Sequence, residues 1–471
     1  MISQISIAEL SDVFGNESRG DTPLERAKSS SQIYVRSQTQ IANYKPSAKG
    51  LQLSAEQALR AFGYSTLKEV AWNGSSQLIY DRNEPAQTIS NRRKELGLST
   101  EQVAKAAALN KDDVIKAEKV GVISPIRHLQ RIAEALALDE QVISFVSGAK
   151  GDTELGVRLR TLSRPKSAAR LSPTIVRQLT EAAWVTMRQL TLAQMLGDEP
   201  ELGINKMPSD DYDPPVWKRG YDLAAETRRL LGISEEKPIL NIRELINKLG
   251  IPLIQAEIGK QFAGATVANG DGRGIVVNVQ GSNQNVWVRR MTLCHELGHL
   301  LWEPADRLGK VKVDTYDELS GNFADCVESR ANAFAIAFLA PPRAVSHLIH
   351  ACGTEVEMVS NVMTHFGIGG AAARHHVANV CREFGPNSID TTRVQNWQLP
   401  QPSNEWLVRE DSINDFYPIK SVPITRRGRF AAYAVRAAEQ GIVSFDTVAT
   451  WLRTDIDELK RNVNNIKELS Q

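Results

Sequence analysis

Apolar positions between residues 87 and 147 recur at the spacing of short helices. Ser99 stands before one apolar run and Gln102 follows three residues later, which is the arrangement of a capping box at a helix start. Further short helices are predicted over residues 110–119 and from about residue 125 to 136. Several short helices joined by tight turns indicate a small all-α module.

The pattern changes in the second half of the chain. Residues 251–258 and 274–279 read as strands, and the Asn-Gly-Asp-Gly run over 269–272 predicts a hairpin turn between them. Helices are expected over residues 284–302, 321–339 and 357–367, with a helical segment over 429–469. This order predicts an α+β domain followed by a helical C-terminal segment.

The remaining segments carry weaker patterns. Residues 1–50 are rich in Ser and Gln and predict a mobile arm, followed by one helix and one strand before residue 82. We find no internal repeat. The predicted architecture is multidomain, and its five parts are an N-terminal arm with a small element (1–82), the all-α module (83–148), a linker and helical connector (149–214), the α+β domain (215–382), and an irregular segment with C-terminal helices (383–471).

Composition limits the classes of protein that the chain resembles. The 471 residues have a formal net charge of +1, so no overall charge draws the molecule to nucleic acid or to a membrane. The four cysteines form no C-x-x-C pair and read as reduced thiols. The N-terminus has no signal-peptide pattern and no apolar run is long enough to span a bilayer. We therefore expect a cytoplasmic protein without a membrane partner.

The run His295-Glu296-Leu297-Gly298-His299 carries the clearest chemistry. Residues four apart lie on one face of a helix, so both imidazoles can point at one metal ion. Glu296 is rotated by one position and lies beside that ion, where its carboxylate can act as a general base toward water. Two neutral histidines with an adjacent glutamate predict a catalytic zinc site.

A catalytic zinc needs a third protein ligand. The extended motif with a third histidine fails, because Trp302 and Ala305 stand where glycine and histidine are required. The third ligand is therefore expected to be a carboxylate on a later helix, and Glu328 lies on the inward face of the helix predicted over 321–339. Asn332, one turn further on, is expected to orient a ligand histidine. Other carboxylates in the same region stay open as ligands: Asp314, Asp317, Glu318 and Asp325.

Three runs together resemble the ImmA/IrrE metallopeptidase family: Cys294–Leu301, Glu328–Ala335 and Leu339–Pro341. The resemblance covers roughly residues 215–382. It implies a gluzincin-like fold, with His295, His299 and Glu328 on zinc and Glu296 as the base. Members of that family typically cleave a helix-turn-helix repressor, so a protein substrate of this kind is implied. We further expect the strand at residues 275–279 to pair with an extended substrate.

Residues 89–138 resemble the XRE-type helix-turn-helix family, through Ser99, Val103-Ala104, Val114 and Ile132-Ala133 among others. The resemblance implies binding to double-stranded DNA, with the second helix of the motif in the major groove. The residues expected to read bases are Asn110, Lys111 and Lys116, and those expected to contact phosphates include Arg92 and Arg93. Asp112 and Asp113 oppose phosphate binding, so a protein-interaction use of the same fold stays open.

The segment from Arg429 to Leu459 is similar to a short two-helix unit at the end of some members of the metallopeptidase family. Two functions follow from the whole pattern. The first is a zinc-dependent endopeptidase, fused to a DNA-binding module, that cleaves a regulatory protein to control gene expression. The second is a transcriptional regulator or antitoxin whose peptidase fold acts as a sensor or docking domain. A helix-turn-helix domain is also compatible with a homodimer.

Overall fold

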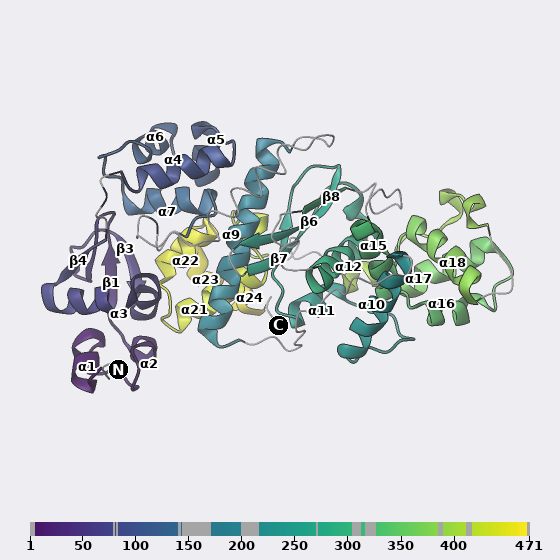
Figure 1. Cartoon of the computed structure of the whole chain (residues 1–471), viewed down its shortest axis with the longest axis horizontal. Helices are drawn as coiled ribbons and strands as arrows, with labels where there is room; N and C mark the ends of the chain where they lie inside the picture. The colour runs from purple at the N-terminus through teal and green to yellow at the C-terminus, as the bar shows by residue number, and fades with distance from the viewer. Residues whose placement is uncertain are drawn as a thin grey trace. The chain divides into compact units, whose positions relative to one another are not determined.

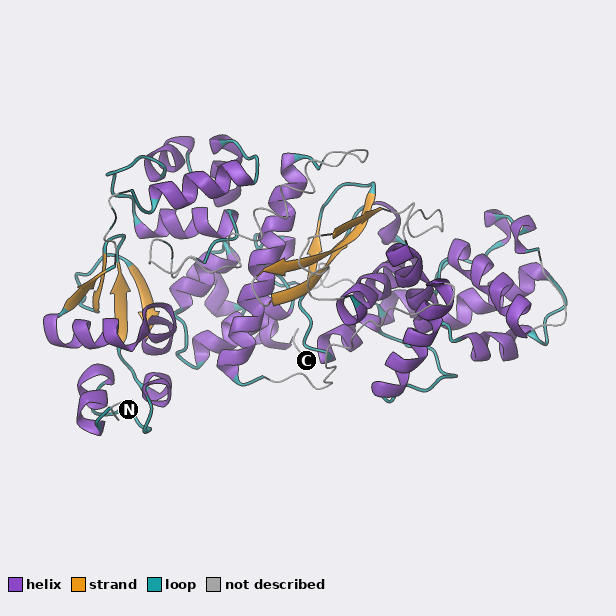
Figure 2. Ribbon diagram, viewed as in Figure 1, coloured by secondary structure: helices purple, strands orange, loops and turns teal. Residues whose placement is uncertain are grey.

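The computed structural model of the chain describes residues 5–78, 81, 83–139, 143, 171–198, 216–269, 272–303, 312–315 (backbone only), 326–384, 390–410 and 417–468. It forms two compact units. Unit 1 comprises Met1–Asp198, Asn269–Gly272 and Ile413–Gln471, and unit 2 comprises Glu199–Ala268 and Arg273–Ser412. Figure 2 shows that each unit is mainly helical, with one small sheet among the helices.

Unit 1 begins with a small α/β layer. Its elements are α1 (Ile7–Phe14), α2 (Pro23–Ser29), β1 (Ile33–Arg36), β2 (Gln40–Asn43), β3 (Leu51–Ser54), α3 (Ala55–Asn73) and β4 (Ser75–Gln77). The four strands pair antiparallel in the order β3-β1-β2-β4, and α3 packs on them (Figure 1).

The expectation of a mobile arm over residues 1–50 is therefore wrong for the described residues from 5 onward. Thr22 and Ser54 each start a helix with a complete capping box, so polar residues here are structural. The strands have four residues or fewer, too short to produce a visible alternation, yet they bury Tyr34 and Leu53. Gly63 interrupts α3 with a φ of 81°.

Four short helices follow: α4 (Ala86–Glu95), α5 (Thr100–Ala107), α6 (Lys111–Ala117) and α7 (Ile126–Ala135). The last three lie where the sequence pattern predicts helices. The capping box of Ser99 and Gln102 is present at the start of α5. Ala108 ends α5 in the left-handed conformation, with a φ of 51°. That conformation favours glycine, which has no Cβ atom.

The C-terminal part of unit 1 is helical: α9 (Pro173–Leu196), η4 (Ile424–Arg426), α21 (Arg429–Glu439), α22 (Phe445–Leu452), α23 (Ile456–Arg461) and α24 (Val463–Glu468). Trp184 of α9 makes edge contacts with Phe430 and Trp451, at ring-centroid distances of 5.6 and 6.4 Å. The C-terminal helices thus share a core with α9.

The pairs α22–α23 and α5–α6 have several local features in common. Each pair starts at a serine N-cap, Ser99 or Ser444, followed by a helix of 8 residues. Each first helix ends at a left-handed residue, Ala108 at a φ of 51° or Arg453 at a φ of 53°. The second helix then starts at an Asn or Asp N-cap. The two pairs therefore share the length of the first helix and a left-handed residue after it.

A cluster of buried charges joins these helices. Arg426 is fully buried and its Nη1 lies 3.0 Å from Oε2 of Glu134 on α7, while its Nε lies 2.8 Å from Oε1 of Glu181 on α9. Burial alone would raise the pKa of Glu181, but Arg426 and Arg453 outweigh it and lower the pKa to about 2. Paired in this way, the charges tie α7, α9 and the C-terminal helices together.

Unit 2 surrounds a second sheet with helices. Its strands are β5 (Leu253–Ala256), β6 (Phe262–Asn269), β7 (Gly272–Asn278) and β8 (Lys312–Thr315), in the order β5-β7-β6-β8. Its helices are α10 (Val216–Leu230), α11 (Ile242–Lys248), α12 (Val286–Trp302), α15 (Cys326–Leu339), α16 (Pro342–Ile349), α17 (Glu355–Phe366), α18 (Gly370–Phe384) and α19 (Asn404–Arg409), with the short turns η1 (Gly281–Gln284), η2 (Thr391–Arg393) and η3 (Asn396–Gln398). One apolar core connects most of them.

The two predicted strands are present as β5 and β7, but the prediction of a hairpin between them is wrong, because they pair in parallel. The strand that ends at Asn269, directly before the remaining residues of the predicted turn, is β6, which the sequence pattern did not predict. β7 pairs in parallel with β5 and lies next to β6 on its other side, so both of its edges are hydrogen-bonded. The expectation that this strand pairs with an extended substrate is therefore wrong. Among the described residues, the edges of this sheet are β5 and β8. Within the same residues, no helix is both long and apolar enough to cross a membrane.

Candidate metal centre

The helix α12 carries the H-E-x-x-H run and is held in place along its N-terminal part. Its first turn is capped by Asn285, whose side chain accepts a hydrogen bond from the backbone N–H of Trp287. Arg290, fully buried, forms an ion pair with Glu410 and lies over the ring of Trp406, with 4.5 Å between its Cζ and the ring centroid. A buried guanidinium held by several groups sets the position of the helix just before His295.

Gly298 allows α15 to approach α12 closely. A Cβ atom at this position would lie 2.7 Å from Cδ1 of Phe334, well inside van der Waals contact. The two helices therefore pack side by side (Figure 1), and the face of α15 that carries Glu328 is brought to the face of α12 that carries the histidines. The glycine inside the motif thus has a packing role.

His295, His299 and Glu328 converge on one point. Nε2 of His295 lies 3.0 Å from Nε2 of His299 and 3.2 Å from Oε2 of Glu328, and the remaining side, from Nε2 of His299 to Oε2 of Glu328, is 3.5 Å. Ligand atoms about 2.1 Å from a tetrahedral zinc are separated from one another by about 3.4 Å. All three side chains are buried. The donor set and its spacing therefore fit one zinc ion.

Charge supports the same assignment. Burial would raise the pKa of Glu328, but the two histidines beside its carboxylate outweigh burial and hold that pKa far below its usual range. The carboxylate is therefore ionised. Two imidazoles and one carboxylate give the three protein ligands of a catalytic zinc site, and the fourth position is left to solvent or substrate.

Outer contacts orient the two histidines. Nδ1 of His295 lies 3.2 Å from Oδ1 of Asn332, and Asn332 is anchored by donating to the carbonyl of Glu328 at 2.9 Å. Nδ1 of His299 faces Oε1 of Glu303 at 3.9 Å, and Glu303 pairs with Arg330. Each imidazole thus has a polar group at the nitrogen that points away from the metal position, which favours the tautomer needed for metal binding.

The residues expected at this site can be compared with their places in the structure. Glu328 and Asn332 lie where the helical pattern predicts them. The rival ligands Asp317, Glu318 and Asp325 lie outside the described residues, and only the backbone of Asp314 is described, in β8. Glu303 was missed, although its place four residues after His299 on the same helical face was visible in the sequence.

The residues expected to contact DNA divide into exposed and buried or paired ones. Asn110, the N-cap of α6, is exposed, and so are Lys111 and Lys116 on that helix. Arg92 is only 3 % exposed. Arg93 pairs with Glu118, with 2.5 Å between Nε and Oε1. In this structure Arg92 is not on a surface that a phosphate can reach, because it is enclosed within the helical module.

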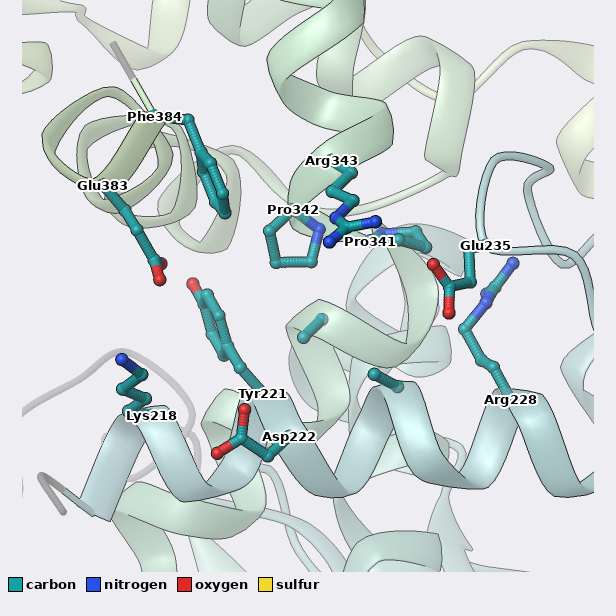
Figure 3. Close-up of a pocket in the computed structure, with 12 residues that line it drawn as sticks. Lys218, Tyr221, Asp222, Arg228, Glu235, Pro341, Pro342, Arg343, Glu383 and Phe384 are labelled. Carbon is teal, nitrogen blue, oxygen red and sulfur yellow. The ribbon is translucent and has the colours of Figure 1, made fainter.

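A cavity of about 280 Å³ lies elsewhere in unit 2, near the C-terminal end of α15. Figure 3 shows Lys218, Tyr221 and Glu383 around one end of it, with Arg343 near its middle. None of the three metal-site residues lines this cavity. It is therefore separate from the metal centre.

Two histidines from one helix and a carboxylate from its neighbour, with a glutamate after the first histidine, are the arrangement of a zinc metallopeptidase. Residues 248–377 match the family model of the IrrE N-terminal-like domain, a peptidase family. The match contains α12 and α15 and so the whole candidate metal centre. No curated protein sequence matches the chain.

Proposed function

We propose that the protein is a zinc-dependent endopeptidase of the ImmA/IrrE type. The observation that carries the proposal is the convergence of His295, His299 and Glu328, whose three ligand atoms lie 3.0 to 3.5 Å apart. The match of residues 248–377 to a peptidase family supports it. A regulator that had lost catalysis would have no chemical need for Glu296 beside this group.

The residues divide the work of peptide hydrolysis. His295, His299 and Glu328 would hold the zinc, which supplies Lewis-acid polarisation of the scissile carbonyl. Glu296 takes a proton from the attacking water and passes it to the leaving amine. Its full burial within the unit excludes bulk water from the carboxylate and so favours proton transfer at a defined place.

Metal analysis and one charge-neutral variant test the proposal. We expect about one zinc per chain, as the single four-coordinate site requires. Glu296→Gln is expected to bind zinc as the wild type does and to lose all cleavage of a proteome-derived peptide library, read by mass spectrometry. Glu383→Gln, an exposed glutamate in the same unit, is the matched control and should cleave normally. Equal cleavage by Glu296→Gln and wild type would contradict the enzymatic function.

We further propose that the substrate is a helix-turn-helix repressor and that α5–α6 bring the enzyme to double-stranded DNA. The exposure of Asn110, Lys111 and Lys116 on α6 supports this proposal, since these side chains are accessible to a duplex. Tethering on DNA would raise the local concentration of the peptidase near a bound repressor. The opposing charges of Asp112 and Asp113 make the direct test necessary.

Binding to duplex DNA at two salt concentrations tests the second proposal. Lys111→Ala with Lys116→Ala should weaken binding and reduce the salt dependence by up to about two counterions. Lys467→Ala is the matched control, because Lys467 lies on α24 and pairs with Glu439. If the double variant binds as the wild type does, α6 does not contact DNA, and a protein-interaction use of the module is favoured.

A further inference from the structure

The carboxylate of Glu296 lies against β6, where Gly264 and Thr266 occupy alternate positions and therefore share one face of the strand. Oγ1 of Thr266 donates a hydrogen bond to Oε2 of Glu296 at 2.8 Å. A Cβ atom at Gly264 would lie 2.7 Å from Oε1 of the same carboxylate. Thr266 thus holds Oε2 of Glu296 by a hydrogen bond, while Gly264, which has no side chain, leaves space for Oε1.

A separate set of hydrogen bonds fixes β6 against α12. Nδ2 of Asn283 donates to the carbonyl of Ala263 at 2.7 Å and to that of Asn278 at 2.9 Å. Its Oδ1 accepts from Oγ1 of Thr292 at 2.9 Å. Thr292 lies one helical turn before Glu296, so Asn283 sets the register between the strand and the helix face that carries the base.

We propose that Gly264 and Thr266 are positioning residues that determine the orientation of the Glu296 carboxylate. A hydrogen bond to an ionised carboxylate is about twice as strong as one between neutral groups. Thr266 is 2 % exposed and Glu296 is fully buried, so water does not compete for this bond. The bond engages Oε2 of Glu296, and the absence of a side chain at Gly264 leaves room for Oε1 beside the strand.

The inference rests on the proposed function, since an orientation of Glu296 matters for catalysis only if Glu296 is the base. Residues of β6, outside the H-E-x-x-H run, then also determine the activity. A side chain at 264 would push the carboxylate away, and the loss of the hydroxyl at 266 would release it. Neither change touches a metal ligand, so zinc binding should persist.

The experiment compares Thr266→Val, Thr266→Ser and Gly264→Ala in the zinc-loaded protein. Valine keeps the shape and removes the hydroxyl, while serine keeps the hydroxyl. Crystal structures report the orientation of Glu296, metal analysis reports zinc, and steady-state kinetics use the peptide that the wild type cleaves best in the library. We expect the carboxylate to leave its present position in Thr266→Val and Gly264→Ala and to keep it in Thr266→Ser.

The kinetic expectation is a fall in kcat of about a hundredfold in Thr266→Val with KM unchanged, because a misplaced group of this kind typically has that effect. Thr266→Ser should restore most of the rate. A Glu296 carboxylate that stays in place in Thr266→Val overturns the inference, whatever the activity. If the carboxylate moves in Thr266→Val but the wild type cleaves no peptide, the positioning of Glu296 by β6 is upheld. The proposed function is then contradicted.

Discussion

Asn332 and Glu303 each face the outer nitrogen of one ligand histidine, and the two contacts differ in kind. The Asn332 contact, at 3.2 Å, joins Nδ1 of His295 to the oxygen of an uncharged amide. The Glu303 contact, at 3.9 Å, is longer, and its carboxylate is also held by Arg330. The outer nitrogen of His295 thus faces an uncharged amide, whereas that of His299 faces a carboxylate that an arginine also holds.

Asn332→Leu should therefore weaken zinc binding by about 10- to 100-fold, the usual effect of removing a group that orients a metal-bound histidine. Competition with a chromophoric chelator measures the affinity. Asn361→Leu is the matched control, because Asn361 lies in the same unit and contacts Sγ of Cys352. An unchanged affinity in Asn332→Leu would mean that His295 is oriented by packing alone.

His376 shows how a buried base couples stability to pH. Its Nε2–H donates to the carbonyl of Ala340 at 2.7 Å, which leaves Nδ1 to accept from the hydroxyl of Tyr221 at 2.6 Å. Burial lowers its pKa from 6.5 to about 4. In the unfolded chain the imidazole takes up a proton below about pH 6.5, whereas in the folded chain it does so only below about pH 4.

Unit 2 should therefore lose on the order of 3 kcal/mol of stability as the pH falls from about 6.5 to about 4, because the unfolded state binds the proton first. Above pH 6.5 this contribution is fully present. Denaturant unfolding across that range measures the slope. His376→Gln should flatten it, and a slope that the variant keeps would assign the effect to other groups.

At the scale of elements, the sequence predicted helices better than strands. The helices α5, α12 and α17 have apolar positions at helical spacing and clear starts, and the structure places them close to the expected ranges. The strands β1 to β4 are too short for a period of two to be visible. Which strand lies at a sheet edge depends on pairing between distant segments, so the interior place of β7 was not visible in its own residues.

The same reasoning applies to the site. His295, Glu296 and His299 share one helix, and a local motif therefore identifies them. The contact of Thr266 with Glu296 joins a strand to a helix thirty residues later, and a lone threonine in a strand carries no signal of it. Residues that act through tertiary contacts are those that sequence patterns miss.

The turn after α5 gives a prediction at this scale. Ala108 has a φ of 51°, a conformation that costs a residue with a Cβ atom roughly 1 kcal/mol. Ala108→Gly should therefore raise the free energy of unfolding by up to about 1 kcal/mol. Lys105→Gly is the control, because Lys105 is exposed inside the same helix and glycine there should lower stability by about 1 kcal/mol. Chemical denaturation distinguishes the two, and a destabilised Ala108→Gly would contradict the argument.

The buried charges between α7, α9 and the C-terminal helices give a second prediction about stability. Arg426→Leu leaves Glu134 and Glu181 buried without their main partner, and should lower the free energy of unfolding by about 3–5 kcal/mol. Arg461→Leu, an exposed arginine on α23, should change it by less than about 0.5 kcal/mol. A small effect of Arg426→Leu would mean that water or rearranged side chains replace the guanidinium.

At the scale of the whole molecule, the two units have separate cores, and the candidate metal centre belongs to unit 2 alone. A ligand that binds only the folded form stabilises the unit that holds it. Zinc at about 1,000 times its dissociation constant should therefore stabilise unit 2 by about 4 kcal/mol. Calorimetry should show one transition that shifts upward with zinc and one that does not.

The variant His299→Ala should abolish the shift and leave the other transition unchanged. Removal of zinc by a chelator should reproduce the variant in the wild-type protein. If both transitions move together with zinc, the two units unfold as one and the metal stabilises the whole chain.

Unit 1 is assembled from segments on either side of unit 2, and this has a consequence for synthesis on the ribosome. While residues up to 412 emerge, the face of α9 that later meets Phe430 and Trp451 has no partner from the C-terminal helices. Domains generally fold as units in the order of their emergence. The inserted unit can therefore complete its fold first, and a chain cut short after it would carry a finished peptidase unit beside an unfinished neighbour open to chaperones and proteases.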